Sequence, residues 1–339
     1  MHITNRDQYM LTNKIAVLYH YCEVDDIYRD NLLHFLVFAY LPNVDFYIIV
    51  AGPSSLDLPK ASNLNYIYVK NINLDYGGYA QAITSGAVDI NKYEKFIFIN
   101  SSVRGPYLPT YCHQDWIAPF LDPLKDEAIG LVGSSINILP LDDDVTLDYA
   151  KRHQMKVKNP LSHVQTTIFA MRGQTLKLLQ DNNFFLDKEK MAKSEVIQSY
   201  EIAMSQKIIE QGLNIKCLLP EYNFIDYRLG HSDVNPQSGR GDSLLYKKYF
   251  GRTVHPYEGI YIKTNRMLYD IDYLNSLSAS MLSDALPSEI FSKDSPLLTL
   301  FIKNLKRNHL EYKRKPYLWM KLSRWADKKL IKLAYRGIS

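Results

Sequence analysis

Cysteine is scarce in this chain, and the few cysteines that occur do not form a scaffold pattern. The 339 residues include only Cys22, Cys112 and Cys217, which are far apart and form no CxxC pair. An odd number of widely spaced thiols argues against a disulfide framework or a zinc site, and it fits a reducing compartment.

Long apolar runs are missing as well. The first residues, MHITNRDQYMLTNK, contain no apolar segment of the kind that secretory signals have. Nowhere does the chain approach the roughly 18 uninterrupted apolar residues of a spanning helix. We therefore predict neither a secretory signal nor a transmembrane helix, and we expect a cytoplasmic protein.

Negative charge is rare in the C-terminal segment. Residues 303–339 contain twelve Lys or Arg against two acidic residues, a net charge of +10, so the rest of the +4 chain carries −6. Residues 317–335 place Leu, Trp and Ala on one helical stripe among basic residues, which predicts a helix on an anionic membrane surface. A helix docked on its own domain or on a partner is an alternative. Because the remaining chain is acidic and shows no nucleic-acid module, we expect no nucleic-acid partner.

The overall composition is that of a soluble globular protein, with 46% hydrophobic and 22% charged residues. The length allows one large α/β domain or two modest ones. Tyrosine is frequent, with 26 residues. Its flat face and polar tip suit stacking on sugars and bases, although half-buried packing explains the same excess.

Apolar runs alternate with helical patterns along the first part of the chain. Strands are predicted at 14–21, 45–50, 65–69, 95–99 and 128–132, and helices at 27–40 and 78–88. Short links between such units predict a mostly parallel sheet with right-handed crossovers, flanked by helices.

The pattern continues less regularly after residue 150. Further strands are predicted at 164–171 and 214–219, and helices at 174–180 and at 194–211, where Gly212 is a C-cap. A polar loop occupies 231–243, and the chain is helical and basic from about 285. With no internal repeat visible, we predict an α/β domain over 1–284 and a helical basic appendage over 285–339.

Two polar loops follow predicted strands. In the first, Asp75 and Tyr76 precede Gly77 and Gly78, and two glycines at a strand-to-helix turn allow a close approach to an anionic ligand. Asp75 can instead be a plain N-cap. The second loop begins at Asn100-Ser101-Ser102 and continues to Arg104, whose guanidinium can bind phosphate. A simple turn, followed by Gly105-Pro106, explains that loop equally.

Two later segments carry further candidates. Glu201, early in a predicted helix, is suited to remove a proton from a hydroxyl, whereas Glu195 faces elsewhere; a surface glutamate is the alternative. His255, Lys263 and Arg266 come together after the polar loop and can close over a diphosphate. The acidic run at 142–144 is a rival metal cluster, but it more closely matches the charged start of a helix.

The order of these motifs resembles that of GT-A-fold glycosyltransferases, especially bacterial polysaccharide-assembly enzymes. The resemblance covers about residues 12–270: a strand, then Asn71-Ile72-Asn73-Leu74-Asp75-Tyr76-Gly77-Gly78-Tyr79, a strand ending in Asn100-Ser101-Ser102-Val103-Arg104, His163-Val164-Gln165, Glu201 and a late His255. It implies a GT-A, Rossmann-like sheet and transfer of a sugar from a nucleotide-sugar, with a UDP-sugar favoured, to a saccharide or lipid-linked acceptor.

The resemblance also implies roles for individual residues. Tyr19 and His20 would lie by the nucleotide base, the 75–79 segment on the donor side, and His163 and Gln165 on the acceptor side. Glu201 would be the base of an inverting transfer, and His255 would touch the metal or diphosphate. Asn100–Ser102 falls where the family has Asp-x-Asp. Its neutral oxygens disfavour the Mn²⁺ or Mg²⁺ that would accompany the donor, so we assign no metal ligand and no certain cofactor.

Two other functions are compatible with parts of this pattern. The missing Asp-x-Asp favours a non-catalytic nucleotide- or sugar-binding homologue attached to the membrane, whereas Glu201 and the glycine turn favour an enzyme. A nucleotidyltransferase is disfavoured because no Gly-rich, Lys-containing phosphate loop follows the first strand. We expect an enzyme that acts in surface polysaccharide synthesis on the inner face of the cell membrane.

Overall fold

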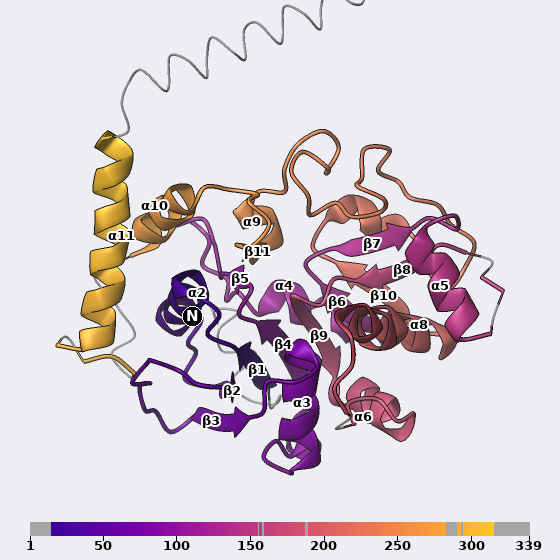
Figure 1. The fold of residues 1–339 in the computed structure, drawn as a ribbon, viewed down its shortest axis with the longest axis horizontal. Helices are drawn as coiled ribbons and strands as arrows, with labels where there is room; N and C mark the ends of the chain where they lie inside the picture. Colours follow the sequence, from indigo (N-terminus) through magenta and orange to yellow (C-terminus); the bar gives the residue numbers. More distant parts are fainter. Residues whose placement is uncertain are drawn as a thin grey trace, which may run out of the picture.

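A seven-stranded, mainly parallel sheet forms the centre of the molecule (Figure 1). The computed structural model describes residues 15–154, 156–157, 159–186, 189–282, 290–292 and 294–314. The strand order is β10-β6-β9-β4-β1-β2-β3, and only β9 runs antiparallel to its neighbours. The predicted α/β class with a mostly parallel sheet is confirmed.

The strands form where apolar, β-branched runs are long enough to be buried on both faces. Their bounds are β1 Ile15–Tyr21, β2 Asp45–Ala51, β3 Leu64–Val69, β4 Lys95–Asn100, β5 Val103–Arg104, β6 Ile129–Gly133, β7 Ile136–Leu139, β8 Leu161–Val164, β9 Ile168–Arg172, β10 Asn214–Cys217 and β11 Ile262–Lys263. Two small sheets, β5 with β11 and β7 with β8, accompany the central one.

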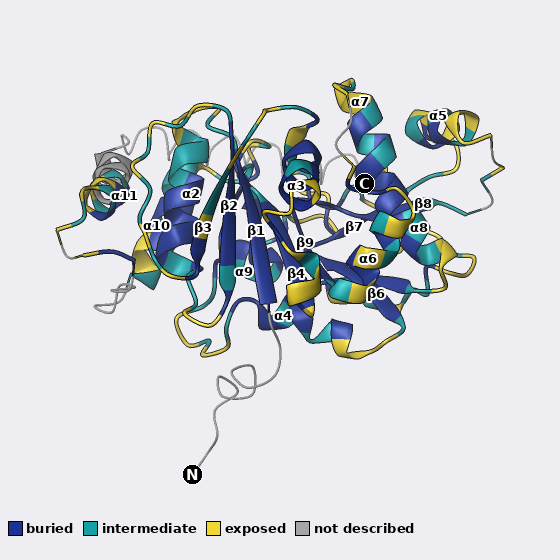
Figure 2. Cartoon of the chain, turned by 90° about the horizontal axis from the view of Figure 1, so that it is seen from below, coloured by how far each residue is buried: buried dark blue, intermediate teal, exposed yellow. Residues whose placement is uncertain are grey.

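Helices cover both faces of the central sheet (Figure 2). They are α2 Asp26–Phe38, α3 Leu74–Thr84, α4 Ala118–Leu121, α5 Asp144–Arg152, α6 Gly173–Asp181, α7 Lys193–Val196, α8 Ala203–Glu210, α9 Pro256–Gly259, α10 Ile271–Met281 and α11 Pro296–Arg314. A π-helical turn, η3 (Ile197–Ile202), joins α7 to α8, and short 3₁₀ turns occupy Ile90–Lys92, Pro123–Lys125 and Pro220–Phe224.

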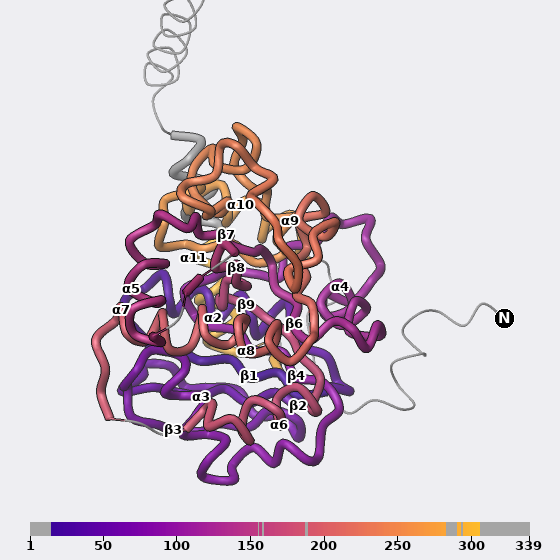
Figure 3. Tube along the Cα trace, turned by 90° about the vertical axis from the view of Figure 1, so that its right-hand side faces the viewer, coloured from indigo at the N-terminus to yellow at the C-terminus, as the bar shows by residue number. Residues whose placement is uncertain are grey.

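The core therefore has two halves. One cluster packs α3, α6, α7 and α8 against one face of the sheet, and the other packs α2, α4 and α11 against the opposite face. Figures 1 and 3 place α9, α10 and the loops around them at one end of the molecule, and β3 with α3 at the other. No described helix combines the length and the apolar character needed to span a membrane.

Two predicted elements differ from the structure, and one helix was not predicted. The helix expected at 78–88 is α3, which begins four residues earlier because Asn73 and Leu74 have positive φ values of 55° and 58°. The strand expected at 164–171 is split into β8 and β9, since β8 pairs with β7 while β9 pairs with β4 and β6. Helix α10 lies inside the predicted catalytic domain and was not expected.

The described part of the predicted appendage is attached to the domain. Leu298, Phe301 and Leu305 of α11 are buried in the cluster that also holds α2. The predicted membrane-surface helix at 317–335 lies outside the described residues.

Candidate functional site

A pocket of about 580 Å³ opens at the carboxyl ends of β1 and β4. These strands are adjacent, and His20 of β1 lies opposite Asn100 of β4 in the register of the sheet. This edge of a parallel sheet is where α/β folds bind ligands. The lining residues are His20, Cys22, Val24, Tyr28, Asn71, Leu74, Asp75, Tyr76, Asn100, Ser101, Ser102, Thr166, Thr167, Lys193, Val196, Ile197, Glu201, Lys263, Asn265 and Arg266.

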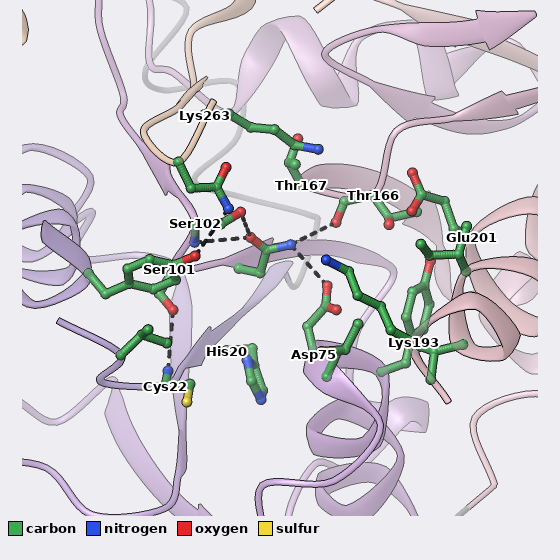
Figure 4. A pocket seen from close by; sticks show the side chains of 18 of the residues that line it. His20, Cys22, Asp75, Ser101, Ser102, Thr166, Thr167, Lys193, Glu201 and Lys263 are labelled. Carbon is green, nitrogen blue, oxygen red and sulfur yellow. Dashed lines mark hydrogen bonds between the residues drawn. The ribbon is translucent and has the colours of Figure 1, made fainter. Parts of the chain in front are cut away.

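Nine of the residues predicted from the sequence line this pocket: His20, Asp75, Tyr76, Asn100, Ser101, Ser102, Glu201, Lys263 and Arg266. They come from segments almost 250 residues apart in the chain (Figure 4). In that view Glu201 and Lys193 enter from one side and Ser101, Ser102 and Cys22 from the other, with Asp75 between them. Eight of the predicted donor residues therefore share one cavity with the predicted base.

The side-chain amide of Asn100 organises the floor of the pocket. Its Nδ2 donates to Asp75 Oδ2 at 3.0 Å and to the Thr166 carbonyl oxygen at 3.3 Å. Its Oδ1 accepts from the backbone N–H of Ser102 at 3.1 Å and from the Ser102 hydroxyl at 2.5 Å. Ser101 Oγ faces the other way and accepts from the backbone N–H of Cys22 at 3.2 Å. Residues 100–102 thus form the local turn expected as the alternative, and the Asn100 amide also fixes the orientation of Asp75.

Within this network, the pKa of Asp75 says most about the pocket. Burial raises the pKa of this carboxyl to about 6, and the Glu201 charge acts in the same direction. The hydrogen bond from Asn100 and the Lys263 charge oppose the increase in its pKa. Asp75 is therefore a carboxyl that changes its charge close to neutral pH.

Gly78 is packed against His20, and Gly77 against the backbone just before α3. A Cβ added to Gly78 would lie 2.3 Å from Cδ2 of His20, and one added to Gly77 would lie 1.9 Å from the carbonyl oxygen of Ile72. Both glycines lie inside α3, so the predicted glycine turn is corrected to a close helix–strand contact. Burial lowers the pKa of His20 to about 4, and its Nε2 has no partner among the described residues.

Glu201 reaches the pocket from the π-helical turn η3. A π turn inserts extra backbone into a helix, and such turns occur frequently at functional sites. Its neighbour Tyr200 is buried and stacks on Tyr76 of α3, with ring centroids 4.9 Å apart and planes at 15°. The stacked pair holds the helix against α3 while the Glu201 side chain lines the cavity.

Lys263 and Arg266 approach from the segment after α9. Lys263 lies in β11, which pairs with β5 directly after the Asn100 loop. Burial lowers the pKa of Lys263, and the neighbouring Arg266 charge contributes to that decrease, while the Glu201, Asp242 and Asp75 charges oppose it. Arg266 Nη1 donates to Asp242 Oδ2 at 2.5 Å and to the Leu244 carbonyl oxygen at 3.1 Å.

Besides Gly77 and Gly78, five predicted donor or acceptor residues do not line the pocket. Tyr19 lies in the core against Phe35. Arg104 is only 1% exposed, and it donates to Asn31 Oδ1 at 2.8 Å and to Asn275 Oδ1 at 2.6 Å. His255 caps α9, where its Nδ1 accepts from Tyr257 N–H at 3.2 Å and its Nε2 lies 2.9 Å from Tyr273 Oη.

The two predicted acceptor residues are buried in and after β8. His163 Nδ1 lies 3.1 Å from the Leu161 carbonyl oxygen. Gln165 Nε2 donates to Asn137 Oδ1 at 2.7 Å and to Asp242 Oδ1 at 2.6 Å. Because Asp242 also holds Arg266, Gln165 is connected to the pocket through that carboxylate without lining it.

Two acidic segments have structural roles. Asp143 accepts from the N–H of Val145 at 2.9 Å and begins α5, as expected for the 142–144 run. Glu195 Oε2 accepts from the N–H of Ala192 at 3.0 Å, and its Oε1 pairs with Arg152 at 3.2 Å.

Sequence reasoning missed several lining residues, above all Lys193. Ile197 precedes Glu201 by four residues, so the helix predicted at 194–211 already placed it on the Glu201 face. Lys193 lies before that predicted helix, and no such spacing pointed to it. Thr166 and Thr167 line the pocket because the strand predicted at 164–171 is interrupted there.

The residues present do not fit a divalent cation. Hard cations prefer several oxygen ligands, charged ones above all. The Asn100 oxygen is already shared by two donors from Ser102. Within the described ranges, no group of three or more His, Cys, Asp or Glu side chains is placed to hold a metal.

No protein-family model and no curated protein matches the sequence. Solved structures do match the chain, and glycosyltransferases are among them. The galactosyltransferase LgtC, solved with donor and acceptor sugar analogues, is 14% identical at a TM-score of 0.38, over 80% of this chain and 97% of LgtC. The bifunctional glycosyltransferase WbbM is 12% identical at a TM-score of 0.31, over 61% of this chain and 39% of WbbM.

A mycobacterial protein is 15% identical at a TM-score of 0.36, over 62% of this chain and 67% of its own. Glycosyltransferases are among the solved structures that the chain matches.

Proposed function

We propose that this protein is a glycosyltransferase that moves a sugar from a nucleotide-sugar to a hydroxyl group of a saccharide or lipid-linked acceptor, with inversion. The observation that carries the proposal is the shared pocket. It brings a carboxylate, Glu201, and two cations, Lys263 and Arg266, to the carboxyl ends of parallel strands. A base for the acceptor and counter-charges for a diphosphate are the groups that such a transfer needs.

The reaction is a single displacement. Glu201 accepts the proton of the acceptor hydroxyl as its oxygen forms a bond to the anomeric carbon of the donor. The bond from that carbon to the diphosphate oxygen breaks, and the electron pair leaves with the diphosphate, near Lys263 and Arg266. One displacement inverts the configuration of the anomeric carbon.

The nucleotide would occupy the β1 side of the pocket, beside Cys22, Tyr28 and Asn71. Tyr28 accepts a hydrogen bond at its hydroxyl from Asn265 Nδ2 at 3.1 Å, which holds its ring at the rim. An aromatic ring held in this way is suited to stack on a base. We take UDP-sugars as the first donor class to examine.

The membrane is the proposed place of action. The basic segment at 317–335, with its apolar stripe, supports an enzyme at an anionic surface on the inner face of a bacterial cell membrane, next to a lipid-linked acceptor. Surface polysaccharide synthesis is the process that this combination fits.

The test is a transfer assay with Glu201→Gln, using a panel of nucleotide-sugars. We expect kcat to fall by at least about a hundredfold while the donor Kd stays unchanged, since general-base catalysis contributes about 10²–10⁴-fold. Glu210→Gln, at the exposed end of the same helix, is the matched control and should keep wild-type activity. Near-normal turnover in Glu201→Gln would reject this role. Nucleotide-sugar binding without any turnover in the wild type would favour the non-catalytic homologue.

A further inference from the structure

The floor of the pocket already has a bridge between its polar groups. Asn100 joins Asp75 through Nδ2 and Ser102 through Oδ1, and both ends of its amide are fixed by hydrogen bonds. A cation bound between Asp75 and Ser102 would need the Asn100 oxygen to leave two donors and the Asp75 oxygen to leave one. The amide therefore occupies the position at which an ion would bridge the same groups.

Lys263 and Arg266 differ in how directly they are paired. Among the described residues, Lys263 Nζ has no hydrogen-bond or ion-pair partner, although the side chain is partly buried. Arg266 is held at Nη1 by Asp242 and Leu244. An ammonium group that is partly removed from water without a paired anion is unfavourable in the free protein, and an anionic ligand would relieve that cost.

We propose that the pocket binds the diphosphate of a nucleotide donor without a divalent cation, with Lys263 and Arg266 as its counter-charges. This inference rests on the proposed function and adds how the leaving group is neutralised. Lys193, on the opposite wall beside Glu201, adds a third cation at the pocket. Lys263 and Arg266 from one segment and Lys193 from α7 can surround a diphosphate. A metal-dependent site would use carboxylates and an ion instead.

Lys263 should contribute more to diphosphate binding than the other two cations. Lys193 is exposed, so water screens its charge, and Arg266 already interacts with Asp242. Lys263 is partly buried and has no direct partner in the described part of the chain, so its interaction with an anion is screened least. Removing its charge should therefore weaken diphosphate binding more than removing that of Lys193.

The experiment is calorimetric titration of the full chain with UDP and, separately, with inorganic pyrophosphate. Each titration is run in excess EDTA and again with saturating Mn²⁺. We expect the wild-type Kd for UDP to agree within about threefold between the two conditions. Lys263→Met should weaken binding about tenfold or more, as expected for loss of a charge-assisted hydrogen bond. Lys263→Arg should recover part of the affinity, and Lys216→Met, a partly buried lysine in β10, should bind as the wild type does.

The outcomes separate this inference from the proposed function. UDP binding that appears only with Mn²⁺ would overturn the metal-free site and leave the transferase proposal standing. Metal-independent binding that Lys263→Met does not weaken would overturn the role of Lys263. Failure to bind any nucleoside diphosphate or nucleotide-sugar in either condition would refute both proposals.

Discussion

Asp75 is placed where its charge opposes folding, and Asp75→Asn tests that placement directly. The carboxyl is partly buried at the start of α3, and it receives one hydrogen bond from Asn100. An asparagine oxygen can accept the same hydrogen bond at the same position. The substitution therefore removes the buried charge and retains the contact.

The magnitude follows from the pKa of this group. In the folded protein the pKa is raised from its ordinary value of 3.8 to about 6. A carboxyl whose pKa is raised on folding binds its proton more tightly in the folded state, so stability decreases as the pH rises through this interval and is constant above it. The raised pKa lowers the free energy of unfolding by about 3 kcal/mol at pH 8 and by about 1.6 kcal/mol at pH 5. Asp75→Asn should therefore stabilise the protein by about 1.4 kcal/mol more at pH 8 than at pH 5.

The assay is urea unfolding of the wild type and the variant at these two pH values. Asp57→Asn, at an exposed position, is the control and should change stability by less than about 0.5 kcal/mol at either pH. An Asp75→Asn effect that is equal at the two pH values, or larger at pH 5, would refute the reasoning. It would mean that Asp75 is well solvated and not held against the pocket wall.

Three further predictions concern other parts of the molecule. Asn100→Asp should make UDP binding respond to Mn²⁺, because two carboxylates about 3 Å apart attract a divalent cation; calorimetry with no Mn²⁺ effect would contradict this. Arg104→Met should lower the free energy of unfolding by about 2 kcal/mol, because Asn31 and Asn275 lose their buried donor, and it should leave the Kd for UDP within a few-fold of that of the wild type. Deleting residues 316–339, which leaves α11 in place, should release the protein from anionic vesicles; unchanged co-sedimentation would exclude this segment as the anchor.

The sequence predicted the central strands well because their burial requires continuous apolar runs. Lys95–Asn100 and Ile15–Tyr21 could be located in this way, and the polar residues directly after such strands had to gather at one edge of the sheet. This is why the residues from Asn100 onward were predicted to face a ligand, whereas His20 was placed there by the resemblance to glycosyltransferases. The start of α3 was not predictable, because it depends on positive φ values at Asn73 and Leu74.

Most of the other predicted site residues that lie outside the pocket are held by partners that are distant in the sequence. Arg104 looked like a phosphate ligand because its loop follows a strand, but Asn31 and Asn275 hold it in the interior. His255 looked like a metal or diphosphate ligand until α9 and Tyr273 were seen to engage both ring nitrogens. No local pattern reports contacts across such separations. Lys193 was missed because it lies just before the helix predicted at 194–211, whereas α7 begins at Lys193 itself.

Three groups of the pocket are shifted in one common direction, toward their neutral forms. Burial raises the pKa of Asp75 and lowers the pKa values of His20 and Lys263. A pocket that served only to stabilise the fold would not keep on its walls a lysine and a histidine nitrogen without partners among the described residues, and a carboxyl with a raised pKa. Hydroxyl groups can donate to Asp75 and His20, while an anion can pair with Lys263. A ligand that combines sugar hydroxyls with a diphosphate would satisfy all three at once, which is the chemical reason for choosing a nucleotide-sugar over a simple phosphate or a neutral saccharide.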